Sequence, residues 1–293
     1  MERRIEIALS WGSVSALEWT HGSAADRAVL LLHGGGTDSA SLSWGGIGGR
    51  IAGAGYRVIA PDHPGHGRSP SAPWPVTQER LVEHVGEVVD ALALERPAIG
   101  GLSLGGGMAI GHALRQPGRV SGAMVLGGYG IMPRLGAGWL SRPAQLLGWA
   151  LVRSGLMPAL MRSYASSPAR MERGLRDLVR DADRRTPELV AEAMHTLRRE
   201  GALETFQEWQ RDEVLWNRLR TDYSSRLGAL RAPVLLVHGE SDAGVPLAAA
   251  RRAERLLPDA RLVVAPGAGH WVQRDAPDVA VAAMTGFLDS LER

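Results

Sequence analysis

The chain has 293 residues, of which 45% are hydrophobic and 22% charged, a balance typical of a folded globular protein. It contains no cysteine, which excludes disulfides, thiolate metal sites and cysteine nucleophiles. All 33 basic residues are arginine, and without lysine the chain can form neither a Walker phosphate loop nor a pyridoxal Schiff base. The net charge is only +2, and the arginines are interspersed with acidic residues, which is typical of solvated helix faces rather than of a nucleic-acid groove.

No apolar run reaches the length of a membrane-spanning helix, and residues 1–5 lack the apolar core of a secretory signal. We therefore expect a cytoplasmic protein with a small-molecule substrate and no nucleic-acid or membrane partner. The sequence leaves a homodimer open.

The first 126 residues alternate between strand and helix patterns. Continuous apolar runs such as 28–32 are typical of strands buried on both faces, and a plausible helix cap, Thr77, precedes helical spacing. The predicted strands are 4–9, 14–20, 28–32, 56–60, 97–102 and 120–126, and the predicted helices are 41–54 and 77–94. This alternation predicts an α/β fold with a mostly parallel sheet flanked by helices.

The alternation stops at Tyr129 and resumes near residue 233. In between, the spacing predicts only helices, at about 143–153, 158–165, 168–184, 187–199 and 202–219. Strands at 233–238 and 260–265 and helices at 247–257 and 276–291 follow. We therefore expect a core domain of residues 1–128 and 223–293, with residues 129–222 inserted as a helical cap over the ends of the strands.

Ser103 lies between a predicted strand and a helix-like segment, in the sequence Gly101-Leu102-Ser103-Leu104-Gly105. A sharp turn there would expose the hydroxyl above the sheet, and it needs small residues two positions before and after the serine. Gly101 and Gly105 meet that need. This is the pattern of a nucleophile elbow.

A serine hydroxyl needs an adjacent base, and that base needs an acid to orient it. Asp242 and His270 each follow a predicted strand, as Ser103 does, so all three can reach one edge of the sheet. Glu240, two residues before Asp242, is the alternative acid.

Five motifs in this order resemble the α/β-hydrolase family, here with a helical cap, over nearly the whole chain. They are His33-Gly34-Gly35-Gly36, the 62–69 loop, the segment around Ser103, the 238–242 segment followed by Val245-Pro246, and Gly269-His270-Trp271. The resemblance implies Ser103 as nucleophile, His270 as general base and Asp242 as its orienting acid, and the family spacing favours Asp242 over Glu240.

The resemblance further implies an oxyanion hole formed by the backbone N–H groups of Gly35 and Leu104. It places Gly34, Gly36 and Trp271 beside the substrate. It gives His33 a structural role. Asp62, His63 and His66 are residue types found in metal sites, but the matching loop of the family is a structural turn, so we expect no metal and no cofactor.

These residues predict hydrolysis of an acyl bond, most simply the carboxylic ester of a small, partly apolar substrate. One alternative is the meta-cleavage-product hydrolases, which cut carbon–carbon bonds with the same three residues and which the 269–273 segment resembles. In that family a cap arginine meets the substrate carboxylate, for which Arg153, Arg162 and Arg170 are candidates. A thioesterase or cyclase of secondary metabolism and a non-enzymatic ligand receptor are further alternatives.

Overall fold

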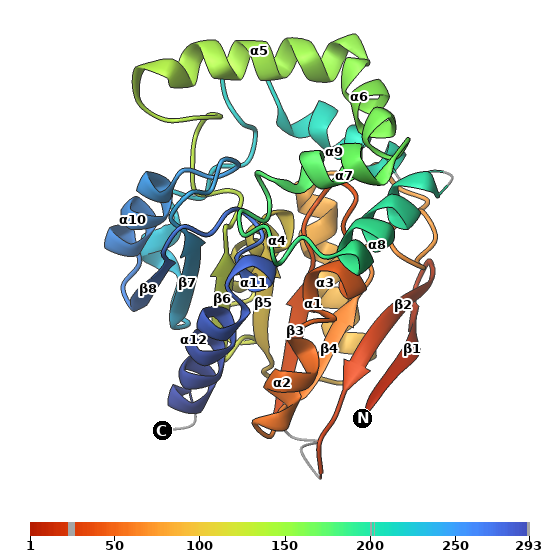
Figure 1. Cartoon of the computed structure of the whole chain (residues 1–293). Helices are drawn as coiled ribbons and strands as arrows, with labels where there is room; N and C mark the ends of the chain where they lie inside the picture. Colours follow the sequence, from red (N-terminus) through yellow and green to blue (C-terminus); the bar gives the residue numbers. More distant parts are fainter. Residues whose placement is uncertain (23–26, 200, 202, 292–293) are drawn as a thin grey trace.

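A computed structural model of the chain describes residues 1–22, 27–199, 201 and 203–291. Its centre is one sheet in the order β1-β2-β4-β3-β5-β6-β7-β8 (Figure 1). β1 and β2 pair antiparallel, β2 pairs antiparallel with β4, and every later pairing is parallel. The strands are Glu2–Leu9, Gly12–Trp19, Ala28–Leu32, Arg57–Pro61, Ala98–Leu102, Gly122–Leu126, Val234–Gly239 and Ala260–Ala265. The predicted α/β fold is confirmed.

Alternate residues of the buried strands pack into two separate cores. Leu30 and Leu32 of β3 face one core, and Val29 and Leu31 face the other. Because neither face of these strands meets water, apolar residues occupy successive positions instead of every second one. This is why the sequence predicted the central strands so closely.

Helices cover both faces of the sheet and precede or follow the strands as predicted. Outside the β6–β7 connection they are α1 (Ala40–Trp44), α2 (Gly48–Gly53), α3 (Gln78–Ala91), α4 (Leu104–Arg115), α10 (Leu247–Leu256), α11 (Val272–Asp275) and α12 (Pro277–Ser290). Thr77 caps α3 by accepting a hydrogen bond from the Arg80 N–H at 3.2 Å. The single helix predicted at 41–54 is wrong, because the chain breaks it into α1 and α2 around Gly45 and Gly46.

In the described part of the chain, five α-helices lie between β6 and β7, and Figure 1 shows them across the top of the sheet. They are α5 (Ser141–Ser154), α6 (Leu156–Tyr164), α7 (Pro168–Leu175), α8 (Pro187–Arg198) and α9 (Glu204–Glu213). The predicted starts at Pro168 and Pro187 are confirmed. The predicted helix 202–219 is too long, since α9 ends at Glu213; residue 202 lies outside the described part of the chain.

α7 also ends earlier than predicted, at Leu175 instead of residue 184. The chain beyond it hydrogen-bonds to another segment. The Trp271 N–H donates to the Leu178 carbonyl at 2.8 Å, and the Asp275 carboxylate accepts from the Arg180 N–H at 2.8 Å and the Asp181 N–H at 2.9 Å. These contacts with a distant loop replace the helical hydrogen bonds.

Within the described residues, none of the helices combines the length and the apolarity that crossing a bilayer requires.

Candidate functional site

Ser103 occupies a strained turn between β5 and α4. Its backbone angles are φ 50° and ψ −112°, and it is one of two described non-glycine residues with positive φ. Such a conformation costs on the order of 1–3 kcal/mol and persists only where its surroundings hold it. The Ser103 N–H donates to the Leu126 carbonyl and its own carbonyl accepts from the Tyr129 N–H, both at 2.9 Å. Ser103 thus protrudes at the carboxyl edge of the sheet.

The two flanking glycines allow very close backbone contacts. A Cβ atom on Gly101 would lie 2.2 Å from the Gly105 carbonyl, and one on Gly105 would lie 2.3 Å from the Leu32 carbonyl and 2.5 Å from that of His33. Only glycine fits at either position, which is the physical reason for the spacing seen in the sequence.

Replacing Gly105 with alanine should therefore destabilise the fold by more than about 2 kcal/mol, because the obstructing atoms belong to the backbone and cannot move aside. Gly286 of α12 is the matched control, since a Cβ atom there meets nothing within 4 Å. Gly286→Ala should raise stability by roughly 0.5–1 kcal/mol, as expected inside a helix. Urea denaturation compares the two variants. Equal stability of both would contradict the contact at Gly105.

Asp242 and His270 form a hydrogen-bonded pair. His270 Nδ1 lies 2.9 Å from Oδ1 and 2.8 Å from Oδ2 of Asp242, whose side chain is fully buried. Burial alone would raise the pKa of Asp242, but the hydrogen bond and charge of His270 and the Val245 N–H outweigh it and lower the pKa. An ionised carboxylate only accepts, so Nδ1 of His270 carries the proton and Nε2 is left to act as a base.

The turn at Gly127 brings this pair and Ser103 to one place. A Cβ atom on Gly127 would lie 3.0 Å from Asp242 Oδ2 and 3.2 Å from His270 Nδ1. The residues on either side of the turn, Leu126 and Tyr129, hydrogen-bond to the backbone of Ser103. The turn after β6 therefore adjoins all three predicted residues, which lie at the carboxyl edge of the sheet.

The glycine loop after β3 contains backbone N–H groups with no hydrogen-bond partner among the described residues. The Gly34 N–H donates to Asp38 Oδ2 at 2.7 Å, so it is occupied. Among the hydrogen bonds between described residues, none uses the N–H groups of Gly35 or Leu104. The contacts of Gly105 with Leu32 and His33 hold α4 against this loop. Both predicted oxyanion donors thus lie at the same edge.

Asp38 holds the glycine loop in place. Its carboxylate is buried and also accepts from the Ser43 hydroxyl at 2.6 Å and the Ser39 N–H at 2.8 Å. Burial raises the pKa of this carboxyl to about 6. Asp38 was not predicted to take part in the site. Its only signal in the sequence is an acidic side chain four positions after Gly34.

α9 packs directly on the glycine loop through Phe206. A Cβ atom on Gly35 would lie 2.3 Å from Phe206 Cε2, so the ring rests on the Gly35 backbone. Phe206 stacks on Trp209, with ring centroids 5.5 Å apart, and Trp209 meets Tyr129 edge-on at 4.9 Å. Phe206, backed by Trp209 and Tyr129, thus covers Gly35, one of the two predicted oxyanion donors. No sequence signal distinguished Phe206 from an ordinary core residue.

Trp271, predicted to contact substrate, is buried in the second core, with 4% of its surface exposed.

Two further residues support the site. Asp275 fixes the His270 loop, since Asp275 Oδ2 accepts from the Gly269 N–H at 2.5 Å as well as from the Arg180 N–H. His238 supports the site from the other side, with Nε2 2.8 Å from the Val245 carbonyl. Sequence reasoning gave neither residue a role.

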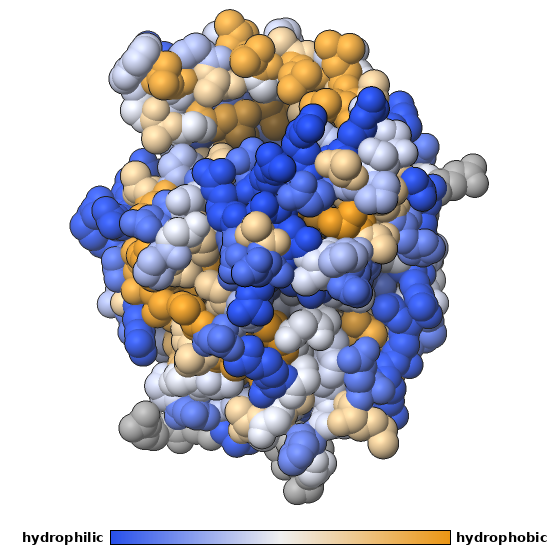
Figure 2. Space-filling view, in the orientation of Figure 1, coloured by the Kyte–Doolittle hydropathy of each residue, from blue (hydrophilic) through white to orange (hydrophobic). Residues whose placement is uncertain are grey.

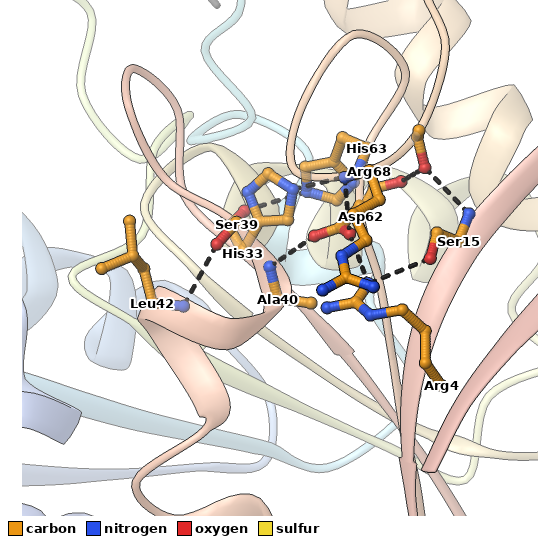
Figure 3. A network of polar contacts seen from close by, with 10 residues as sticks. Arg4, Ser15, His33, Ser39, Ala40, Leu42, Asp62, His63 and Arg68 are labelled. Atoms are coloured by element: carbon orange, nitrogen blue, oxygen red, sulfur yellow. Dashed lines mark hydrogen bonds and ion pairs between the residues drawn. The ribbon is translucent and has the colours of Figure 1, made fainter. Parts of the chain in front are cut away.

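The loop that contains Asp62 and His63 forms a network of internal contacts (Figure 3). Asp62 accepts from Arg4 at 2.8 Å and from the backbone of Ala40 and Arg68 at 2.9 Å. The His33 and His63 rings pack with their centroids 3.8 Å apart and their planes tilted by 33°, and the His63 backbone N–H donates to His33 Nε2 at 2.9 Å. Burial and the neighbouring histidines lower the pKa of both imidazoles well below the usual range. These groups tie β1, β3 and β4 together.

A buried carboxylate, Glu213, joins the end of α9 to the site. It accepts from the Tyr129 hydroxyl at 2.6 Å and from the Thr221 N–H and hydroxyl at 2.9 Å each. Tyr129 also hydrogen-bonds to Ser103. Burial raises the pKa of Glu213, although the hydrogen bonds from Tyr129 and Thr221 oppose the shift.

The raised pKa has a consequence for stability. The contribution of Glu213 is fully present below the ordinary carboxyl pKa and is lost as the pH rises through the folded value. Glu213→Gln keeps a neutral group that can bond to Tyr129 and Thr221. Its stability relative to the parent protein should therefore improve from about pH 4 to about pH 7. Urea denaturation at both pH values tests this, with Glu208→Gln, at an exposed position, as the control. If the difference in free energy of unfolding between Glu213→Gln and the parent protein were the same at both pH values, the prediction would be refuted.

Comparisons with known proteins agree with this fold. A model of the "alpha/beta hydrolase fold" family matches residues 27–277. The chain is similar to a 2-hydroxy-6-oxononadienedioate/2-hydroxy-6-oxononatrienedioate hydrolase of Paraburkholderia phymatum, 30% identical over 90% of this chain and 88% of the relative. It is also similar to a 2-hydroxy-6-oxo-6-phenylhexa-2,4-dienoate hydrolase of Burkholderia cepacia, 32% identical over 86% of this chain and 84% of the relative. The structure of a meta-cleavage product hydrolase from Pseudomonas fluorescens superposes with a TM-score of 0.76 and 26% identity, covering 98% of this chain and 97% of the other.

Proposed function

This chain belongs to the α/β-hydrolase family and is a hydrolase, and we propose that it cleaves a carbon–carbon bond beside a ketone in a 2-hydroxy-6-oxo-dienoate. The carrying observation is the similarity to hydrolases of that substrate class along nearly the full length of both chains. The sequence alone favoured ester hydrolysis, with carbon–carbon cleavage as an alternative. The similarity to these relatives reverses that order, so ester hydrolysis becomes the second candidate function.

In this proposal Ser103, His270 and Asp242 act together. His270 Nε2 takes the hydroxyl proton as Ser103 Oγ attacks the ketone carbon, and Asp242 stabilises the imidazolium that forms. The negative oxygen of the tetrahedral intermediate accepts hydrogen bonds from the N–H groups of Gly35 and Leu104. The strained turn places Ser103 in position before substrate arrives.

For the leaving fragment to be a dienolate, the substrate first moves its 2-hydroxyl proton to C5. The intermediate then collapses. The bond between C5 and the attacked carbon breaks, the dienolate leaves with the bonding electrons, and His270 returns the proton to it. Water activated by His270 next attacks the acyl-serine, releasing the carboxylic acid and restoring Ser103. Residues 129–222 serve in this proposal as the cap, with Phe206 and Trp209 closing the substrate site from above.

A particular observation keeps ester hydrolysis as the second candidate. The three arginines considered as partners for a substrate carboxylate, Arg153, Arg162 and Arg170, are all exposed on α5, α6 and α7. Arg153 donates to the Arg211 carbonyl at 2.9 Å, and Arg170 to the hydroxyls of Ser163 and Ser166 at 3.4 and 3.2 Å. A neutral ester needs no such arginine.

Steady-state kinetics with both substrate classes separates the candidates. The yellow 2-hydroxy-6-oxo-dienoates should be bleached with a kcat/KM at least about 100-fold above that for p-nitrophenyl acetate, and Ser103→Ala should abolish both reactions. Ester turnover without bleaching, across dienoates with methyl, phenyl and carboxyl-bearing 6-substituents, would transfer the assignment to an esterase. The absence of turnover with either class would refute both candidates.

A further inference from the structure

The outer surface of α5 and α6 is unusual because its exposed stripe is apolar. Large hydrophobic side chains with 45% to 85% exposure gather there. Figure 2 shows a gathering of orange atoms over the top of the molecule, above the more hydrophilic body. They are Trp139, Leu140, Leu146, Leu147, Leu156, Leu160 and Trp216, which we call the α5–α6 face. Elsewhere in the described chain only Met1 and Leu256 are comparably exposed.

The stripe on α5 follows helical spacing. Leu146 and Leu147 lie one turn beyond Arg142, and Arg153 lies two turns further on, all exposed. On α6 the exposed positions include Leu156, Ala159 and Leu160, again three and four residues apart. By contrast, α3 exposes the charged residues Glu79, Arg80 and Asp90, as is typical of a helix face in contact with solvent.

The segment that carries most of this face has charges of one sign only. Residues 129–171 contain five arginines and no aspartate or glutamate. The arginines are Arg134, Arg142, Arg153, Arg162 and Arg170, and none forms an ion pair with a described carboxylate. Apolar helices bearing tryptophan, leucine and basic residues are typical of proteins that lie on an anionic bilayer surface.

A hollow in the same face combines both properties. It has a volume of about 460 Å³ and is lined by Pro143, Leu146 and Trp216, with Arg134 and Arg142 beside them. Apolar walls with neighbouring guanidinium groups match a lipid, whose acyl chain and anionic headgroup need these two environments.

We propose that the α5–α6 face docks on membranes that contain anionic lipid. The leucines and tryptophans enter the interface, and the arginines meet the headgroup phosphates. The earlier expectation of no membrane partner rested on the missing transmembrane run, which surface docking does not require. Docking would place α5 and α6 against the bilayer.

A second copy of the chain fits this face less well. A two-fold symmetric contact presents the same patch from both partners. It would set five arginines against five arginines with no carboxylate of residues 129–171 between them. An anionic lipid surface supplies the opposite charge.

Vesicle flotation tests the proposal. The intact protein should float with phosphatidylcholine vesicles containing roughly a quarter phosphatidylglycerol, bind those of phosphatidylcholine alone at least about tenfold less, and be released by high salt. Leu146→Ser/Leu147→Ser and Arg134→Glu/Arg142→Glu should each weaken binding at least about tenfold. Leu256→Ser and Arg251→Glu on α10, also exposed, are the matched controls and should bind as the parent protein does.

Circular dichroism and unchanged hydrolysis of a water-soluble substrate establish that each variant is folded, so loss of binding can be assigned to the face. Lack of flotation with the anionic vesicles, or equal weakening by the α10 controls, would overturn the proposal. So would a concentration-dependent dimer in light scattering that Leu146→Ser/Leu147→Ser dissociates, since the face would then be an interface between copies. Vesicle binding tests the docking proposal and substrate turnover tests the proposed function. The two are separate measurements, so failure of one proposal can be told apart from failure of the other.

Discussion

Ser103→Ala is expected to lower kcat by about four to six orders of magnitude, the largest effect of any single substitution in this chain. The substitution removes only the hydroxyl oxygen. The strained backbone is held by two hydrogen bonds that alanine keeps: the N–H of residue 103 donates to the Leu126 carbonyl, and its carbonyl accepts from the Tyr129 N–H. Folding should therefore be little affected, and the loss should lie in the chemical step. Single-turnover kinetics with the preferred substrate, alongside a thermal denaturation curve, measures both quantities.

His270→Ala should cost about as much as Ser103→Ala, and the double variant should be little worse than either. The reason is that His270 acts by accepting and returning the proton of Ser103. Once one of the two residues is removed, the other no longer contributes to the reaction. Ser121→Ala, at the amino end of β6 and away from the site, is the matched control and should retain full activity. A double variant that lost the product of the two separate losses would show that the residues act independently.

The sequence predicted the parts of the fold that local patterns determine. Runs such as Val29 to Leu32 are apolar at every position because both faces of the strand are buried, so these strands were predicted within one or two residues. The glycines around Ser103 carry equally local information, since each admits a backbone contact that a side chain would block.

Other parts depend on contacts between segments far apart in the chain. α7 ends early because Asp275, nearly a hundred residues away, binds the N–H groups of Arg180 and Asp181. Phe206 lies on Gly35 only because α9 packs across the glycine loop. Neither pairing leaves a periodic or compositional trace, so the positions were indistinguishable from ordinary helix and loop residues.

Asp242→Asn is expected to lower kcat by about 10²–10⁴-fold, less than the loss of Ser103. The orientation of the new amide follows from its neighbours. Oδ1 of Asp242 accepts from the Gly244 N–H at 2.8 Å and the Val245 N–H at 2.9 Å. These donors hold the asparagine oxygen in place and leave its NH₂ group facing His270. Nδ1 must then accept a hydrogen bond, so the proton moves to Nε2, which can no longer take the proton from Ser103.

The alternative acid provides the control for this argument. Glu240 is exposed, and its Oε2 accepts from the Gly267 N–H at 2.9 Å without any recorded contact to His270 among the described residues. Glu240→Gln should therefore leave kcat within about twofold of the parent value, since an amide oxygen can still accept from Gly267. The ¹H NMR signal of the proton on His270 Nδ1, hydrogen-bonded to a carboxylate, should persist in Glu240→Gln and vanish in Asp242→Asn. If Glu240→Gln were instead the variant that lost both the signal and the turnover, Glu240 would be the residue that orients His270.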